Sequence, residues 1–143
     1  YYETIGRGSG LIVNLTPDKR GLIPDDLVAA AREMGDEIRR RFSNPVAQSD
    51  LHDKEQVIKF NGAQIIDHIV LMEDLSDGQK ISRYIIEAEA DGKWKVISEG
   101  QTIGHKRIEH FDPVTATAIR FTVTESLTEN AEMRKIALFN TSM

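Results

Sequence analysis

The clearest fold signal in the chain is the stretch Arg83-Tyr84-Ile85-Ile86-Glu87-Ala88-Glu89-Ala90-Asp91-Gly92-Lys93-Trp94-Lys95-Val96-Ile97. Its apolar residues alternate with Glu87 and Glu89, and this period of two is typical of a strand with one buried face. Asp91-Gly92 is a strong signal for a tight hairpin turn, because both residues tolerate a positive φ. The stretch therefore predicts two antiparallel strands joined by a short turn.

Strand-like segments on both sides of this hairpin extend the prediction to a whole domain. They cover residues 56–60, 65–72, 102–110, 118–124 and 134–139. About seven short strands separated by turn signals are typical of an antiparallel β-sandwich. In the segment 102–110, Ile103 and Ile108 differ in parity, so either one of them points outward or Gly104 marks a bulge.

The first part of the chain has a different hydrophobic pattern. Leu11-Ile12-Val13-Asn14-Leu15 places apolar residues at successive positions, as in a parallel strand that helices cover on both faces. Such a strand needs neighbours on both sides to satisfy its backbone, and this region supplies none. We therefore expect residues 1–42 to belong to a larger α/β domain.

A helix is predicted to follow from about Pro24, since Pro, Asp25 and Asp26 suit its first turn. Its apolar residues fall on one face at helical spacing. The polar stretch 43–54, which contains Pro45, is expected to be a linker. The predicted organisation is a strand and helix of an incomplete domain over 1–42, a linker over 43–54 and a β-sandwich over 55–143.

Composition excludes several classes of function. The chain of 143 residues has a formal net charge of −5 and no cysteine. Nucleic-acid binding needs clustered Lys and Arg, and thiolate chemistry needs Cys, so neither is expected. No apolar run approaches the length of a membrane-spanning helix. The four histidines lack the spacing of a metal site, and Gly8 and Gly10 lack the rest of a nucleotide-binding motif.

Residues 1–23, Tyr-Tyr-Glu-Thr-Ile-Gly-Arg-Gly-Ser-Gly-Leu-Ile-Val-Asn-Leu-Thr-Pro-Asp-Lys-Arg-Gly-Leu-Ile, resemble the end of the catalytic barrel in bacterial and plant-type α-L-fucosidases. Met34-Gly35 is similar to a hydrophobe-Gly pair in the final helix of that barrel. The second region resembles the discoidin, or coagulation-factor type C, domain that follows the barrel in the same enzymes. Its matching segments are 69–74, 94–97, 102–108 and 113–117.

The resemblance implies a fold and a function. The fold is a discoidin-like (galactose-binding-like) antiparallel β-sandwich, preceded by the last β-strand and helix of a (β/α) barrel. The function is that of a C-terminal fragment of a retaining exo-α-L-fucosidase, a glycoside hydrolase that removes terminal α-L-fucose from glycans, with the sandwich supporting the barrel. Retention requires two carboxyl groups about 5–5.5 Å apart. The family's two carboxylate motifs have no match here, so no catalytic residue is assigned and the chain alone is expected to be inactive.

The resemblance also sets the expected partners. These are an upstream barrel and, through it, fucosylated glycans, whereas nucleic acid and membranes are not expected. The abrupt start at Tyr1 predicts a missing upstream part, and the family suggests a periplasmic or secreted protein. No cofactor or metal is predicted. A structural calcium ion at Asp74 and Asp77 is the alternative to a solvated acidic turn.

The alternative function is a carbohydrate-binding module that targets a glycosidase to glycans. Substrate-binding candidates are Asn14, at the end of the predicted barrel strand, and His105 and Arg107 in the sandwich. In an ordinary strand Lys106 would point away from these two, which argues against a convergent sugar site. Trp94 is expected to pack in the core rather than stack on a sugar.

Overall fold

The computed structural model describes residues 1–50 and 53–142, in which one helix precedes six strands. Their bounds are α1 (Asp25–Phe42), β1 (Ala47–Ser49), β2 (Glu55–Glu73), β3 (Ile81–Ala90), β4 (Lys93–Gln101), β5 (Arg107–Ser126) and β6 (Met133–Phe139). The strands pair antiparallel in the order β1-β6-β2-β5-β3-β4. The helix begins after Pro24, as predicted.

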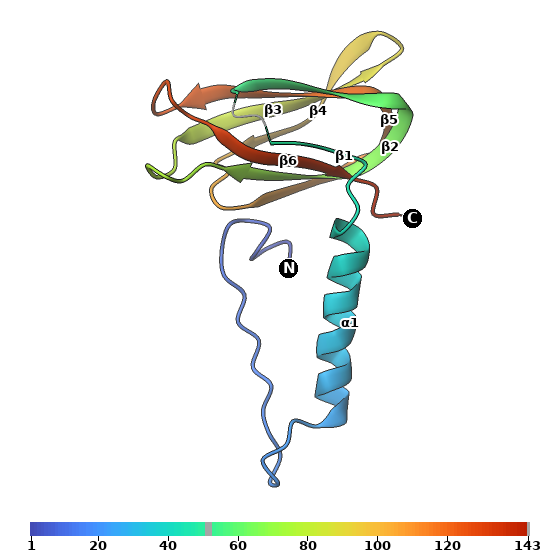
Figure 1. Cartoon of the computed structure of the whole chain (residues 1–143), viewed down its shortest axis with the longest axis vertical. Helices are drawn as coiled ribbons and strands as arrows, with labels where there is room; N and C mark the ends of the chain where they lie inside the picture. Colours follow the sequence, from blue (N-terminus) through green and yellow to red (C-terminus); the bar gives the residue numbers. More distant parts are fainter. Residues whose placement is uncertain (51–52, 143) are drawn as a thin grey trace.

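The sheet folds over itself into two layers (Figure 1). Strands β2 and β5, of 19 and 20 residues, take part in both layers, with register shifts between Lys59 and Gln64 and between Ile66 and His68. One layer contains β1, β6, the end of β2 and the start of β5; the other contains the start of β2, the end of β5, β3 and β4. This confirms the predicted antiparallel sandwich, although the predicted segments 56–60 and 65–72 form one bent strand.

The core lies between the layers and also extends to the outer face of one of them. Ile69 and Leu71 point into the main core, whereas Val70 packs in a second cluster with Ala137 and Phe139. Tyr1, Tyr2 and Phe42 cover this second cluster. The layer containing the end of β2 is therefore buried on both faces, which explains its run of consecutive apolar residues.

After Tyr1 and Tyr2, which pack on the sandwich, residues 3–17 extend away from it as an irregular segment, here called the strap, and α1 returns toward it (Figure 1). Residues 11–15, predicted as a strand, are extended but belong to no strand here. The physical reason is the absence of neighbouring strands that could pair with their backbone groups. No residue of α1 is buried, although its sequence is amphipathic. Within the described residues, no helix is both long and apolar enough to cross a membrane.

Two local predictions need correction. The stretch 43–54, predicted as a linker, contributes the edge strand β1, which pairs with β6 through Gln48 and Ala137. The predicted strand 102–110 begins only at Arg107, because the chain turns sharply between β4 and β5. Thr102 and Gly104 there have φ values of 52° and 63°, in the left-handed region that interrupts a strand. Gly104 thus marks a loop rather than a bulge.

Candidate functional site

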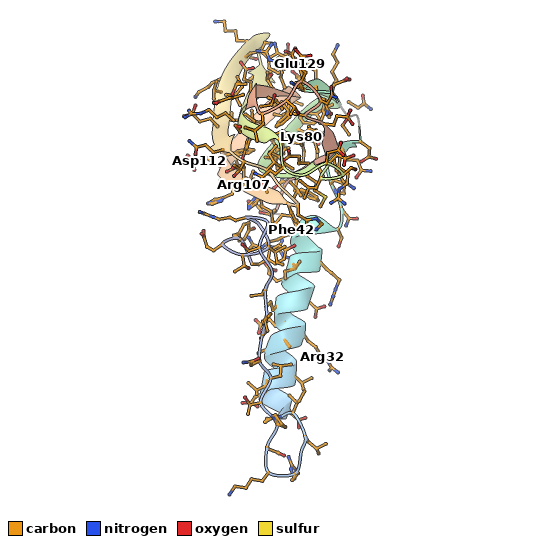
Figure 2. The ribbon with its side chains drawn as sticks, turned by 90° about the vertical axis from the view of Figure 1, so that its left-hand side faces the viewer. Arg32, Phe42, Lys80, Arg107, Asp112 and Glu129 are labelled. Carbon is orange, nitrogen blue, oxygen red and sulfur yellow. The ribbon has the colours of Figure 1, made fainter. Side chains whose placement is uncertain are left out.

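An aromatic cluster joins the first 42 residues to the sandwich. The ring of Phe42, at the end of α1, lies 6.0 Å from the rings of Tyr1 and Tyr2 and 5.4 Å from that of Phe139 on β6. Figure 2 shows Phe42 where the helix meets the sandwich, with Arg32 farther along the helix. Edge-to-face and tilted contacts at these distances are favourable beyond the apolar area they bury. The cluster therefore fixes the chain end and the helix end on the same sheet face.

A chain of hydrogen bonds runs through this cluster. His68 Nε2 lies 2.9 Å from the Tyr2 hydroxyl, and His68 Nδ1 lies 2.8 Å from Asp67 Oδ1. Arg41 Nη1 donates to the same Tyr2 hydroxyl over 3.2 Å. With Nδ1 donating to Asp67, Nε2 of a neutral ring accepts from Tyr2. The network therefore links β2, the first residues of the chain and the end of α1.

Asp67 is the buried end of this network. Its side chain also accepts hydrogen bonds from the Thr141 backbone N–H at 2.9 Å, the Thr141 hydroxyl at 3.1 Å and the Ser142 hydroxyl at 2.9 Å. Burial would raise the pKa of Asp67, but hydrogen bonds from His68, Thr141 and Ser142 outweigh it and lower that pKa. Asp67 is thus held as a carboxylate that also binds the C-terminal residues to the sandwich.

An exposed apolar surface lies beyond this junction. Ile12 is 91% exposed and Val13 57%, and Leu22 and Ile23 are also exposed. On α1, Met34 is exposed as well. Asp18 shapes the turn between strap and helix, accepting hydrogen bonds from the Arg20 side chain and from the backbone of Arg20 and Leu22. The turn is therefore ordered, while the apolar residues around it lack a cover.

The structure separates the three predicted substrate-binding residues. Asn14 is exposed on the strap, among the apolar residues that lack a cover. His105 and Arg107 instead line one pocket of about 300 Å³ between the sandwich and the strap. Lys106 points elsewhere, since its Nζ donates to the Tyr1 hydroxyl over 2.9 Å, so the predicted divergence of Lys106 from its neighbours is confirmed.

Arg107 is held in place by Glu109, which does not itself line the pocket. Its Nε donates to Glu109 Oε1 over 2.7 Å, and the hydroxyl of Tyr84 makes a very short hydrogen bond to the same oxygen. Burial, followed by the Glu109 carboxylate, raises the pKa of Tyr84 far above its usual range, so Tyr84 remains a donor. An antiparallel bridge between Arg7 and Arg107 brings the strap to the same place.

The remaining candidates have other roles. Trp94, predicted in the core, is half-buried at the surface with the Arg120 guanidinium 4.5 Å from its ring centre. Asp74, one of the two suggested calcium ligands, accepts hydrogen bonds from Ser76, and Asp77 pairs with Lys80. Residues 1–50 and 53–142 contain no group of three or more His, Asp or Glu that could hold a metal ion. His52 lies outside the described residues.

Sequence reasoning missed the role of His68. Its spacing from the other three histidines indicates no metal site, yet His68 sits beside Asp67 inside the apolar run of β2. A polar pair in such a run must be buried and satisfied by partners, and this was the available signal. Nothing in the sequence indicated that those partners would be Tyr2 and Thr141, at opposite ends of the chain.

The chain is similar to α-L-fucosidases of known sequence and structure. No protein-family model matches the chain. A curated relative, α-L-fucosidase 1 of rice (Oryza sativa subsp. japonica), whose activity is inferred, is 22% identical over 158 aligned positions. The match covers 86% of this chain and 31% of the rice protein.

Solved structures agree with this relationship. A protein of Bacteroides thetaiotaomicron described as an α-L-fucosidase is 40% identical with a TM-score of 0.91, covering 96% of this chain and 32% of its own. A GH29 fucosidase of Ruminococcus gnavus, solved with fucose, is 21% identical with a TM-score of 0.86, covering 98% and 35%.

A more distant structure matches the sandwich only in fold. It contains two carbohydrate-binding modules of Clostridium perfringens ZmpB with GalNAc, at 20% identity and a TM-score of 0.51, covering 60% of this chain and 23% of that one. The chain spans about a third of the length of the rice and Bacteroides relatives. In sequence and in structure, it is a homologue of the α-L-fucosidases and corresponds to their C-terminal portion.

Proposed function

We propose that this chain acts as the C-terminal part of a retaining exo-α-L-fucosidase, in which residues 1–42 complete the catalytic barrel and the sandwich supports it. The observation that carries the proposal is the uncovered apolar surface of the strap and helix. Ile12 and Val13 are consecutive exposed apolar residues in an extended segment whose backbone pairs with no strand. In addition, α1 has no buried residue. Both are the features of a barrel strand and its helix without the remaining barrel.

The directions of residues 11–15 and of α1 favour a structural role for the sandwich. Residues 11–15 run away from the sandwich, and α1 returns toward it (Figure 1). Barrel active sites lie at the C-terminal ends of the strands. The catalytic end would then be near Asn14, beyond a helix of 18 residues that spans about 27 Å. The sandwich would lie at the opposite end of the barrel, where contacts serve stability.

The junction described above gives the sandwich a means of support. Tyr2 immediately precedes the strap, and Arg41 and Phe42 end the helix, and all three contact His68 directly or through Tyr2. The strap and the helix are thereby held side by side at the sandwich. Fixing both ends of a strand–helix unit reduces the conformational entropy lost when that unit enters a barrel.

A chimaera with the B. thetaiotaomicron relative tests the proposal. The region of that protein that matches this chain is replaced by residues 1–143, and hydrolysis of an aryl α-L-fucoside is measured. We expect the chimaera to be active, and the same protein without the region, as well as the isolated chain, to be inactive. A chimaera that folds but has no activity, or turnover by the isolated chain, would contradict the proposal.

The second candidate, a carbohydrate-binding module that targets a glycosidase to glycans, has less support. Sugar stacking needs a free aromatic face, and Trp94 is half-buried with the Arg120 guanidinium over one of its two faces. The convergence of His105 and Arg107 in one pocket is the observation in its favour. The lining of that pocket has no carboxylate, which bears on the kind of sugar it could hold.

A further inference from the structure

The pocket between the sandwich and the strap is lined by two arginines and a histidine. Residues of four segments line it: Arg7 and Gly8 from the strap, Leu75, Gly78 and Gln79 from the loop before β3, Thr102, Ile103, Gly104 and His105 from the loop before β5, and Arg107 at the start of β5. The chain carries a net charge of −5, yet two arginines and a histidine line this pocket and no carboxylate does. The lining therefore presents cationic side chains and no carboxylate, while Glu3 and Glu109 pair with the two arginines from outside the lining.

The lining is rich in hydrogen-bond donors. Arg7 contacts Glu3 through Nε and Nη2, and Arg107 contacts Glu109 through Nε. These bonds use only part of each guanidinium group, which has five N–H donors. Gln79, Thr102 and His105 are exposed at the same pocket. A neutral sugar hydroxyl both donates and accepts and is usually held with the help of carboxylates, whereas this lining suits an acceptor-only oxyanion.

Three residues that line the pocket have positive φ values. Thr102, a β-branched residue, has a φ of 52°, which such residues rarely adopt. Gly8 and Gly104 also have positive φ values, of 78° and 63°. Of these three, only Thr102 is in an unfavourable conformation, and such conformations cluster at ligand sites, where the surrounding structure maintains them. Arg107 donates to Glu109, which also accepts a hydrogen bond from Tyr84, so the pocket has one cation in a fixed position.

We infer that this pocket binds the carboxylate or sulfate group of an acidic saccharide. That the ligand carries an oxyanion is inferred from the pocket lining alone. That the oxyanion belongs to a saccharide rests on the proposed function. Because the pocket adjoins the sandwich end of the strap, it lies away from the proposed catalytic end near Asn14. It would therefore hold a charged sugar at a distance from the fucose that is cleaved, and add affinity for glycans that contain both.

Calorimetric titration of the 143-residue chain tests the inference. The probes are glucuronate, galactose 6-sulfate, galactose, fucose and inorganic sulfate. We expect saturable binding of one or both charged sugars, weakened by added salt, with neutral sugars and free sulfate binding at least about tenfold more weakly. The sugar that binds tells a carboxylate from a sulfate ester.

Three variants locate the site. Arg7→Gln and His105→Gln change exposed residues and should each reduce affinity by about tenfold, as expected for the loss of a charge-assisted contact. Arg83→Gln is the matched control, because its pair with Glu125 is as exposed as the pair of Arg7 with Glu3. Thermal unfolding establishes that all three fold.

Each other outcome overturns the inference. No binding, binding of fucose as tight as that of both charged sugars, or equal loss in Arg83→Gln would exclude an oxyanion site in this pocket. Binding of free sulfate as tight as that of the sulfated sugar would exclude a saccharide site. Binding by the chain that is lost in an active chimaera would mean that the barrel covers the pocket. Activity of the chimaera tests the proposed function separately.

Discussion

Replacing Asp67 by alanine tests the junction between the sandwich and the two ends of the chain. Asp67 is 4% exposed and accepts hydrogen bonds from His68, Thr141 and Ser142. Asp67→Ala leaves the buried Thr141 backbone N–H without its acceptor and leaves the Nδ1–H of His68 with only the Thr141 hydroxyl, 3.2 Å away. Each such donor costs about 1–3 kcal/mol, and loss of a buried charged partner about 3–5 kcal/mol. We expect the free energy of unfolding at pH 7 to fall by about 3–5 kcal/mol.

The effect should depend on pH in a defined direction. The pKa of Asp67 is lower in the folded chain than its unfolded value of about 3.9. The stabilisation from the carboxylate is therefore fully present above about pH 4, and it is lost as the pH falls through the folded pKa. The difference between the wild-type chain and Asp67→Ala should consequently shrink between pH 5 and pH 3.

Urea unfolding followed by circular dichroism at pH 7, 5 and 3 measures both effects. Asp77→Ala is the control, since the Asp77 side chain is 82% exposed and its pair with Lys80 is 3.5 Å long. Exposed pairs contribute about 0–1 kcal/mol, so this variant should change stability little. A loss below about 1 kcal/mol for Asp67→Ala, or the same loss at pH 3 as at pH 7, would refute the reasoning.

Two further substitutions test separately the junction with the sandwich and the exposed apolar surface of the strap. Phe42→Ala removes the half-buried ring that contacts Tyr1, Tyr2 and Phe139, and should lower the free energy of unfolding by about 2 kcal/mol in urea titrations; an unchanged midpoint would mean that the helix end does not pack there in solution. Ile12→Lys should change the stability of the isolated chain by less than about 0.5 kcal/mol, because Ile12 is 91% exposed, yet abolish activity of the chimaera. Full activity of that chimaera would show that Ile12 faces no barrel core.

The local elements of the fold were predictable because their signals are local. Asp91-Gly92 forms the predicted hairpin turn, with φ values of 53° and 70° at these residues, and Pro24 precedes the helix. The folding of the sheet was not predictable in the same way. Gly62 and Pro113 are turn signals in the sequence, yet they lie within the continuous strands β2 and β5 near their bends. Whether such a residue ends a strand or bends it depends on partners distant in sequence.

The candidate site shows the same limit. The pair His105 and Arg107 was identified from residue type, but only the fold reveals the strap and Gln79 beside them. The absence of strand partners for residues 11–15 followed from the sequence, since one doubly apolar strand cannot satisfy its own backbone. That argument uses only residues that are close together in the sequence. The contacts of His68, in contrast, are with Tyr2 and Thr141, which lie near opposite ends of the chain.

Hydrogen exchange of the Leu11 to Leu15 amides tests most directly the claim that the strap completes a barrel. In the isolated monomeric chain these amides have no strand partner, so they should exchange at rates close to those of an unstructured peptide. In the active chimaera they should become as strongly protected as the amides of β2, because two neighbouring strands would then accept and donate their hydrogen bonds. Strong protection in the proven monomer, or no gain of protection in the chimaera, would contradict the account.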